Sequence, residues 1–210
     1  MEPDSEKNIF GRLEKEYPGA STALEFRDPQ QMLVATILSA QCTDKRVNMI
    51  TKNLFKKYKT SRDFADADPD ELEQEIRSAG FYRNKTKSII GSAQMIEKEF
   101  DGKVPKTMDD ILLLPGVQRK TANVVLSEAY GVTAGIAVDT HVKRLSNRLG
   151  LSTEIDPVKI ERDLMEVFPK DRWYAICNLL ISHGRNICKA RVPLCGECIL
   201  NDICPSAFTF

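Results

Sequence analysis

The sequence lacks the features that mark membrane-spanning, fibrous and secreted proteins. No apolar run approaches the roughly 18 residues that a transmembrane helix needs, and residues 1–7 are polar and acidic. Glycine and proline are too few, at 11 and 10 of 210 residues, for a fibrous or low-complexity chain. An excess of one charge is also absent, since 30 Lys and Arg balance 30 Asp and Glu, which argues against a protein that coats nucleic acid indiscriminately. We therefore expect a globular protein of one or two domains, without a membrane partner.

Period-two alternation of apolar and polar residues, the signal of a half-buried strand, is missing as well. Apolar residues instead recur at helical spacing along almost the whole chain. Capping residues precede several of these segments, and they are Thr43, Asp68-Pro69, Thr107 and Asp156-Pro157. The pattern predicts an all-α fold of about ten short helices joined by short loops.

Disulfide bonding is not indicated, because four of the six cysteines cluster near the end of the chain. Cys188, Cys195, Cys198 and Cys204 have the spacing C-x6-C-x2-C-x5-C, so their thiolates can converge on one centre. Structural zinc sites usually draw on two tight C-x2-C-like pairs, whereas an iron–sulfur cubane accepts wider, uneven loops. Only Cys195 and Cys198 form such a pair. The spacing favours an iron–sulfur cluster, with zinc and four unliganded structural cysteines as alternatives.

Residues 111–126 contain two apolar helical segments separated by a Pro-Gly turn. The first segment ends at Leu114, Pro115-Gly116 reverses the chain, and the second begins near Gln118. A helix-hairpin-helix of this kind exposes backbone N–H groups that can hold a phosphate without reading base sequence. The same pattern also occurs in plain helix connections. Three basic groups would give a neutral molecule one basic face, and they are Arg83, Lys85 and Lys87, then Arg119 and Lys120, then Lys143, Arg144 and Arg148.

Lys120 follows the hairpin turn directly and is a candidate nucleophile. An amine in the first turn of a helix lies near the positive end of the helix dipole, and if it is partly desolvated it is easier to deprotonate. An ordinary surface lysine is the alternative, and this residue alone does not decide between them.

Asp139 stands at the start of the next helix, after a loop and a short apolar run. Aspartate is a preferred N-cap, which is sufficient to explain its presence. A carboxylate there can also stabilise positive charge on a sugar or move a proton. His141 is a candidate DNA contact, and His183 is expected to be a buried, hydrogen-bonded side chain.

Five segments together resemble the endonuclease III family of helix-hairpin-helix DNA glycosylases. The resemblance covers the chain from about Pro29 to Cys204, and any one segment would be a weak signal. Their joint order and spacing make a chance match unlikely. The segments are Leu38–Gln41, Gly80–Lys85, Leu114–Ala122, Val138–His141 and the four-cysteine tail.

The resemblance implies a fold, a cofactor and an activity. Residues 22–132 would form a six-helix barrel with the hairpin, and residues 1–21 and 133–210 a 4Fe-4S cluster domain made from both chain ends, with the DNA cleft between. The protein would act in the cytoplasm of a prokaryote as a monomer on damaged double-stranded DNA. It would remove oxidised pyrimidines as a glycosylase and then cleave the strand as an AP lyase, by β-elimination through a lysine Schiff base.

The resemblance also implies roles for particular residues. Lys120 would be the nucleophile and Asp139 the essential carboxylate, while Gln41 and Phe81 would fill the gap left by a flipped base. The remaining DNA contacts would be Pro115, Gly116, Val117, Gln118, Arg119, His141, Lys143 and Arg144. The cluster ligands would be Cys188, Cys195, Cys198 and Cys204.

The chain departs from the family pattern at three positions, and two other activities remain open. Gln118 stands where glycine is frequent, Phe81 where leucine is common, and Gly135 where the loop usually has a proline. A glycosylase without lyase activity, for adenine or mismatched bases, would not need Lys120. A noncatalytic iron–sulfur DNA-binding protein would need neither Lys120 nor Asp139.

Overall fold

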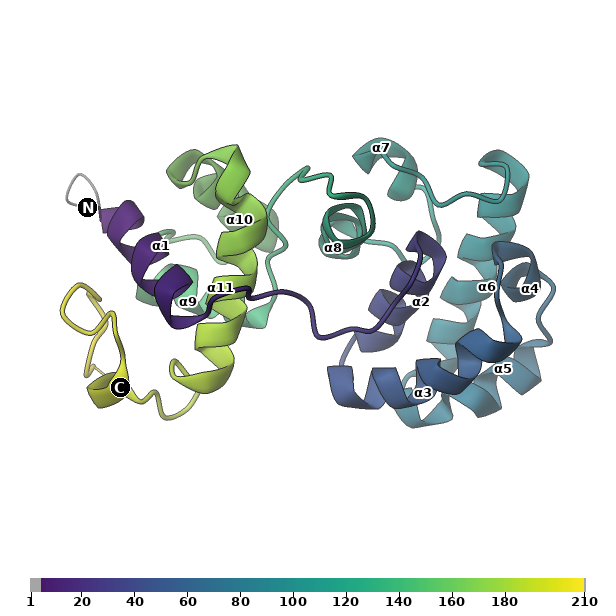
Figure 1. The fold of residues 1–210 in the computed structure, drawn as a ribbon, viewed down its shortest axis with the longest axis horizontal. Helices are drawn as coiled ribbons and strands as arrows, with labels where there is room; N and C mark the ends of the chain where they lie inside the picture. Colours follow the sequence, from purple (N-terminus) through teal and green to yellow (C-terminus); the bar gives the residue numbers. More distant parts are fainter. Residues whose placement is uncertain (1–4, 210) are drawn as a thin grey trace. The chain divides into compact units, whose positions relative to one another are not determined.

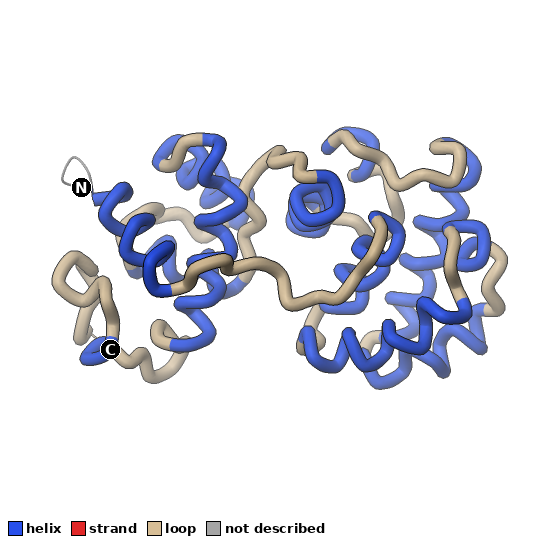
Figure 2. Tube along the Cα trace, in the orientation of Figure 1, coloured by secondary structure: helices blue, strands red, loops and turns tan. Residues whose placement is uncertain are grey.

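Every regular element in residues 5–209, the part of the chain that the structure describes, is helical (Figure 2). The structure is a computed structural model, and it confirms the expected all-α fold. Its α-helices in chain order are α1 (Ser5–Glu16), α2 (Pro29–Ser39), α3 (Asp44–Lys57), α4 (Ser61–Ala65), α5 (Pro69–Ile76), α6 (Tyr82–Glu99), α7 (Met108–Ile111), α8 (Arg119–Tyr130), α9 (Thr140–Arg148), α10 (Pro157–Val167) and α11 (Trp173–Asn186). Its 3-10 helices are η1 (Arg77–Ala79), η2 (Lys170–Arg172) and η3 (Cys195–Glu197).

The predicted helix starts are confirmed, and side-chain caps define them. Thr43, Asp68, Thr107 and Asp156 each accept a hydrogen bond from a backbone N–H of the first turn that follows. These bonds satisfy donors that have no partner inside the helix.

The chain divides into two compact units, one made of Met1–Thr22 with Gly135–Phe210 and the other of Ala23–Ala134. The boundaries expected from the resemblance, 22 and 132, lie one and two residues from those of the second unit.

The unit 23–134 is organised around α2, which is apolar on every side. All residues of α2 from Met32 to Leu38 are buried, as expected for a helix surrounded by others. It packs against α3, α6 and α8, and Figure 1 shows it within this group. Leu54, Ile89 and Val125 contribute to the core of this unit.

The other unit is built on α9 and α11, which pack against each other. Val142 and Leu145 of α9 and Leu180 of α11 are fully buried. Helix α1 packs on α11, so the first described segment belongs to the same unit as the cysteine tail. Leu13 of α1 is completely buried.

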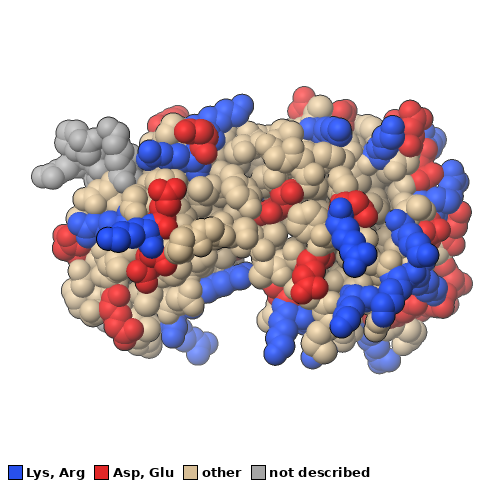
Figure 3. Space-filling model, viewed as in Figure 1, with Lys and Arg blue, Asp and Glu red and all other residues tan. Residues whose placement is uncertain are grey.

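One face of the molecule carries side chains of both charge signs (Figure 3). In the view of Figure 3, basic and acidic side chains occur on both units, with several lysine and arginine side chains gathered on the lower part of the unit 23–134. None of the helices among the described residues combines the length and the apolar character that crossing a membrane requires.

Candidate functional site

The hairpin turn is seated on α6. Gly116 has φ +77, a left-handed conformation that favours glycine. A Cβ at this position would lie 2.2 Å from Ser88 Oγ, so a side chain does not fit. Ser92 Oγ donates to the carbonyl oxygen of Pro115 at 2.7 Å. The turn is thus fixed by close packing and by a hydrogen bond from the same helix.

The start of α8 has no cap from the side chain of its N-cap residue. Gln118 is the N-cap residue, and its side chain makes no capping hydrogen bond. Its φ of −102 and ψ of 169 describe extended backbone that any residue adopts. The glycine that is frequent at this position is therefore not needed for backbone conformation here. Val117, just before it, is buried and donates its N–H to Leu114.

Lys120 is the second residue of α8 and is exposed to solvent. Arg119 beside it is half-buried. The first turn of α8 thus presents an amine at the helix end where the dipole is positive.

Gln41 and Phe81 occupy two strained turns. Both have left-handed backbones, with φ of 54 and 48, which is uncommon for residues other than glycine. Both side chains are exposed, and Phe81 keeps 63% of its surface accessible. Phe81 is therefore not a core residue. Strain of this kind persists where the surroundings hold it, and it gathers at functional sites.

Lys85 holds these two turns together. Its Nζ donates at 2.9 Å to the carbonyl oxygens of Leu38 and Ala79, which lie just before the turns of Gln41 and Phe81. The side chain is only 5% exposed, and burial lowers the pKa of its amine. The buried cation is solvated by backbone dipoles, so it serves the placement of the two turns rather than a basic surface.

Asp139 is the N-cap of α9. Its Oδ1 accepts hydrogen bonds from the backbone N–H groups of His141 at 2.8 Å and Val142 at 2.9 Å. The preceding residues Gly135–Val138 are buried, and the Cys177 thiol donates to Ala137 O at 3.2 Å. The carboxylate is thus held at the end of a packed segment.

The polar residues of α9 face different partners. Arg144 donates to the carbonyl oxygens of Gly184 and Cys188, each at 2.9 Å from Nη2, and its Nη2 lies 3.2 Å from His141 Nδ1. Gly184 allows this approach, since a Cβ there would lie 2.9 Å from His141 Nδ1. Lys143 is half-buried. The guanidinium of Arg144 therefore hydrogen-bonds to backbone carbonyl groups of its own unit.

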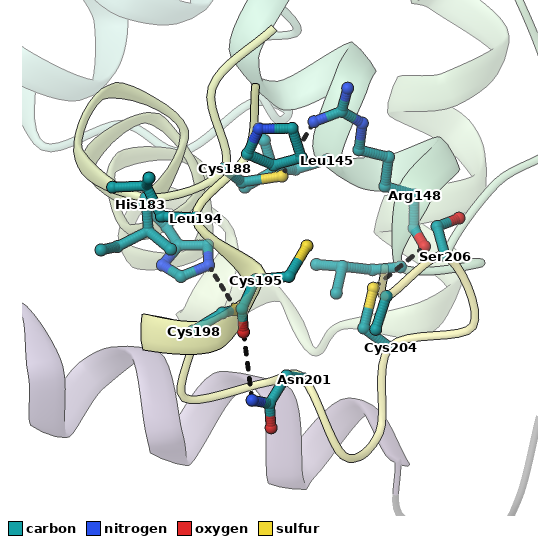
Figure 4. Close-up of a pocket in the computed structure, with 14 residues that line it drawn as sticks. Leu145, Arg148, His183, Cys188, Leu194, Cys195, Cys198, Asn201, Cys204 and Ser206 are labelled. Atoms are coloured by element: carbon teal, nitrogen blue, oxygen red, sulfur yellow. Dashed lines mark hydrogen bonds between the residues drawn. The ribbon is translucent and has the colours of Figure 1, made fainter. Parts of the chain in front are cut away.

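The four clustered cysteines line one pocket (Figure 4). Apolar side chains complete the lining, among them Leu145, Leu149 and Leu194. Among the described residues no three Cys, His, Asp or Glu side chains are placed around a single metal ion. Four thiols around a shared space fit a group that is larger than one ion.

Hydrogen-bond donors surround the sulfur atoms in this pocket. Arg148 Nη1 donates to Cys188 Sγ at 3.3 Å, and the Leu200 N–H donates to Cys198 Sγ at 3.4 Å. His183 Nε2 lies 3.3 Å from the same Cys198 Sγ. Burial raises the pKa of the Cys198 and Cys204 thiols, so a bound cationic group is needed to keep them as thiolates. Donor set and surroundings both fit an iron–sulfur cluster.

Some of these residues were not identified from sequence as parts of a site. The sequence places Arg148 in a basic group with Lys143 and Arg144, and its position four residues after Arg144 puts the two arginines on one helix face. His183 is 2% exposed, as expected, and burial lowers its pKa to about 4. Nothing in the sequence indicated that Lys85 is buried.

The structure places the expected site residues in both units. Gln41, Phe81, the hairpin residues and Lys120 belong to the unit 23–134, whereas Asp139, His141, Lys143, Arg144 and the four cysteines belong to the other.

Two family models match the chain. Residues 34–170 match the HhH-GPD superfamily of base excision DNA repair proteins. Residues 188–204 match the iron–sulfur binding domain of endonuclease III, and they run from the first to the last of the four clustered cysteines.

Similar proteins cover nearly the whole chain. Endonuclease III of Synechocystis is 55% identical over 195 residues, which are 93% of this chain and 89% of that protein. Endonuclease III of Bacillus subtilis is 48% identical over 90% of this chain and 86% of its own length. A solved endonuclease III trapped as a covalent intermediate with DNA superposes with a TM-score of 0.92 at 42% identity, covering 97% of both chains.

Proposed function

Because the chain belongs to the endonuclease III family within the HhH-GPD superfamily, we propose that Lys120 and Asp139 carry out its chemistry. The family establishes a DNA glycosylase with AP lyase activity that acts on duplex DNA in base excision repair. An iron–sulfur cluster is its cofactor. The observation that supports the residue assignment is the exposed amine of Lys120 in the first turn of α8, directly after the hairpin turn.

Lys120 is the nucleophile in this proposal. Its neutral Nζ attacks C1′ of the damaged nucleotide, and the bond from C1′ to the base breaks with its electron pair leaving on the base. The sugar ring then opens to a Schiff base between Nζ and C1′.

The lyase step follows from the Schiff base. The positive iminium acidifies the hydrogen on C2′, a base removes this proton, and the electron pair expels the phosphate from C3′. The strand is cut on the 3′ side of the lesion. Hydrolysis of the imine returns Lys120 to its starting state.

Asp139 supplies the negative charge that these steps need. Its Oδ1 caps α9, and its Oδ2 lies outside the cap. We assign to this carboxylate the stabilisation of the cationic sugar or the removal of a proton from Lys120. The cap keeps the carboxylate in one orientation, so charge stabilisation needs little reorganisation.

The hairpin and the two strained turns bind the DNA. The open N-terminus of α8 accepts a backbone phosphate, with contacts from Pro115 to Arg119. Phe81 enters the base stack, and the Gln41 amide pairs with the base that has lost its partner. Their exposure supports these roles, since both side chains must reach outside the protein.

The chemistry of the substrate completes the proposal. We assign oxidised pyrimidines as the damaged bases, because this specificity accompanies the bifunctional members that the chain resembles. The enzyme acts as a monomer on chromosomal DNA in the cytoplasm of a prokaryote.

Borohydride trapping tests the assignment of Lys120. A duplex with one oxidised pyrimidine should yield a covalent protein–DNA adduct, and the cross-linked peptide should contain Lys120. The Lys120→Gln variant should bind the duplex without trapping or cleavage, while Lys103→Gln, at another exposed lysine of the same unit, should behave as the parent protein. Normal trapping by Lys120→Gln would show that a different amine is the nucleophile.

A further inference from the structure

His183 stands between a tyrosine and a cluster cysteine. Its Nδ1 lies 3.1 Å from Tyr17 Oη, and its Nε2 lies 3.3 Å from Cys198 Sγ. Figure 4 shows the imidazole turned toward Cys198. Tyr17 comes directly after α1, far from Cys198 in sequence, and its ring meets the imidazole edge-on with centroids 5.9 Å apart.

Protonation of the cysteine determines the direction of these contacts. A cysteine that binds iron is a thiolate and has no proton to donate, so the hydrogen between it and the ring must reside on Nε2. With its proton on Nε2, the imidazole has a lone pair on Nδ1 that faces the Tyr17 hydroxyl 3.1 Å away. The Tyr17 hydroxyl must then donate to Nδ1.

We propose that Tyr17 and His183 form a hydrogen-bond relay that fixes the imidazole tautomer donating to Cys198, and thereby sets the reduction potential and the lifetime of the cluster. Tyr17 is a positioning residue in this relay, because it touches the ring and not the cluster. The inference concerns the cofactor and does not depend on the roles of Lys120 and Asp139.

The effect on the cluster has a simple electrostatic basis. A hydrogen bond to a thiolate ligand withdraws charge from sulfur and stabilises the more negative, reduced cluster, which raises its reduction potential. Cys198 accepts a second such bond from the Leu200 N–H. The relay therefore acts on the ligand that already receives a backbone donor, and removing either member leaves that thiolate more electron-rich.

Removing the Tyr17 hydroxyl should not displace the cysteine loop, since α1 holds this loop at a separate point. Arg12 donates to both carboxylate oxygens of Asp202, at 2.6 and 3.0 Å, and to the Ile199 carbonyl oxygen at 2.9 Å. The Tyr17→Phe variant keeps the ring and its edge-on contact, and it loses one oxygen atom.

The test uses the intact, cluster-loaded protein without DNA. Tyr17→Phe should shift the cluster to a more negative potential in voltammetry and lose iron to a chelator about tenfold faster, in line with the effect of changing groups that orient a metal ligand. Resonance Raman bands of the iron–cysteine bonds that respond to deuterium exchange in the parent should respond less. Tyr130→Phe is the matched control, since it removes a hydroxyl that donates to Val104 O at 2.6 Å in the other unit, and its cluster should be unchanged.

A second variant separates the two members of the relay. His183→Leu removes the donor to Cys198 and should shift the potential at least as far as Tyr17→Phe. If His183→Leu does not assemble a cluster, Tyr17→Phe alone decides. A Tyr17→Phe protein with the parent potential, chelator rate and deuterium response would overturn the relay, whatever His183→Leu does.

Discussion

Asp139 Oδ1 lies 2.9 Å from the backbone nitrogen of Val142, so the proposed catalytic carboxylate is also the cap of its helix. Aspartate at this position has two functions that ordinary mutagenesis would confuse. An alanine would remove both the charge and the cap. Asparagine retains an oxygen that can cap, and it removes only the charge.

Asp139→Asn should separate catalysis from helix stability. We expect its stability to change by no more than a few tenths of a kcal/mol, while Asp139→Ala loses about 1 kcal/mol because α9 loses its cap. Both variants should bind lesion DNA and form the borohydride adduct on the order of a hundred-fold more slowly. Denaturant titration measures the change in stability, and single-turnover trapping measures the rate of adduct formation. An Asp139→Asn variant that forms the adduct at the parent rate would show that Asp139 acts only as a helix cap.

Lys143 and Arg144 should behave differently, although the resemblance assigned both to DNA contact. Lys143→Ala should weaken damaged and undamaged duplex alike and lower the slope of affinity against salt by about one unit. Arg144→Ala should instead destabilise the cysteine loop, because its guanidinium binds the carbonyl oxygen of Cys188. The two variants are distinguished by their iron content and by their affinity for duplex DNA at several salt concentrations.

Arg144→Lys provides the control for this pair. Lysine keeps the charge but lacks the planar fork that reaches two carbonyl oxygens. If Arg144 acts only on phosphate, Arg144→Lys would keep full iron content, and so would Arg144→Ala.

Gly116→Ala should displace the hairpin turn. The new Cβ meets Ser88 Oγ and Cβ at 2.2 and 2.5 Å, and a left-handed alanine costs about 1 to 2 kcal/mol in addition. We expect lower thermal stability and weaker binding of undamaged duplex, measured by calorimetry and anisotropy. Adding Ser88→Gly to this variant should recover part of the lost stability, because it removes the clash but leaves the backbone strain. If no stability is recovered, the left-handed backbone of Ala at this position, and not the clash, causes the whole loss.

Phe81→Gly should separate stability from damage recognition. Phe81 is 63% exposed and has φ 48, so glycine relieves backbone strain and sacrifices little buried surface. We expect a melting temperature no lower than that of the parent, together with weaker discrimination between lesion and intact duplex. Phe81→Leu keeps an apolar wedge and should preserve discrimination. Equal discrimination by the glycine variant would exclude Phe81 as the wedge.

The sequence was sufficient for the helices and for the cysteine site, because both depend on local patterns. The side chains of Thr43 and Asp156 cap the helices that follow them, and the unequal cysteine spacing favours a cluster over zinc. The direction of long basic side chains was not predictable. Lys85 and Arg148 read as surface charges, but their partners are backbone and sulfur atoms supplied by segments distant in sequence.

The backbone conformation at Gln118 was also not predictable from the sequence. Glycine is frequent at the position of Gln118, so the sequence suggested that the hairpin could hold phosphate differently here. The φ of Gln118 is negative, however, and the residue of the hairpin that requires glycine is Gly116. The contact that makes Gly116 necessary comes from α6, and no feature of the hairpin sequence itself reveals this neighbour.

Helix α9 connects the proposed catalytic carboxylate at its first turn to the cysteine pocket at its last residue. Asp139 caps its first turn, while Arg148, its last residue, donates to Cys188 Sγ and to the carbonyl oxygens of Lys189 and Ala190. A helix of nine residues is only about 13 Å long and moves as a rod. We expect a chain made without its cluster to lose order in the loop that contacts the far end of this helix, because the four cysteines of that loop would have no shared ligand. We therefore expect iron supply to affect the position of the proposed catalytic carboxylate at the near end, and repair capacity to follow iron status even when the amount of protein is constant.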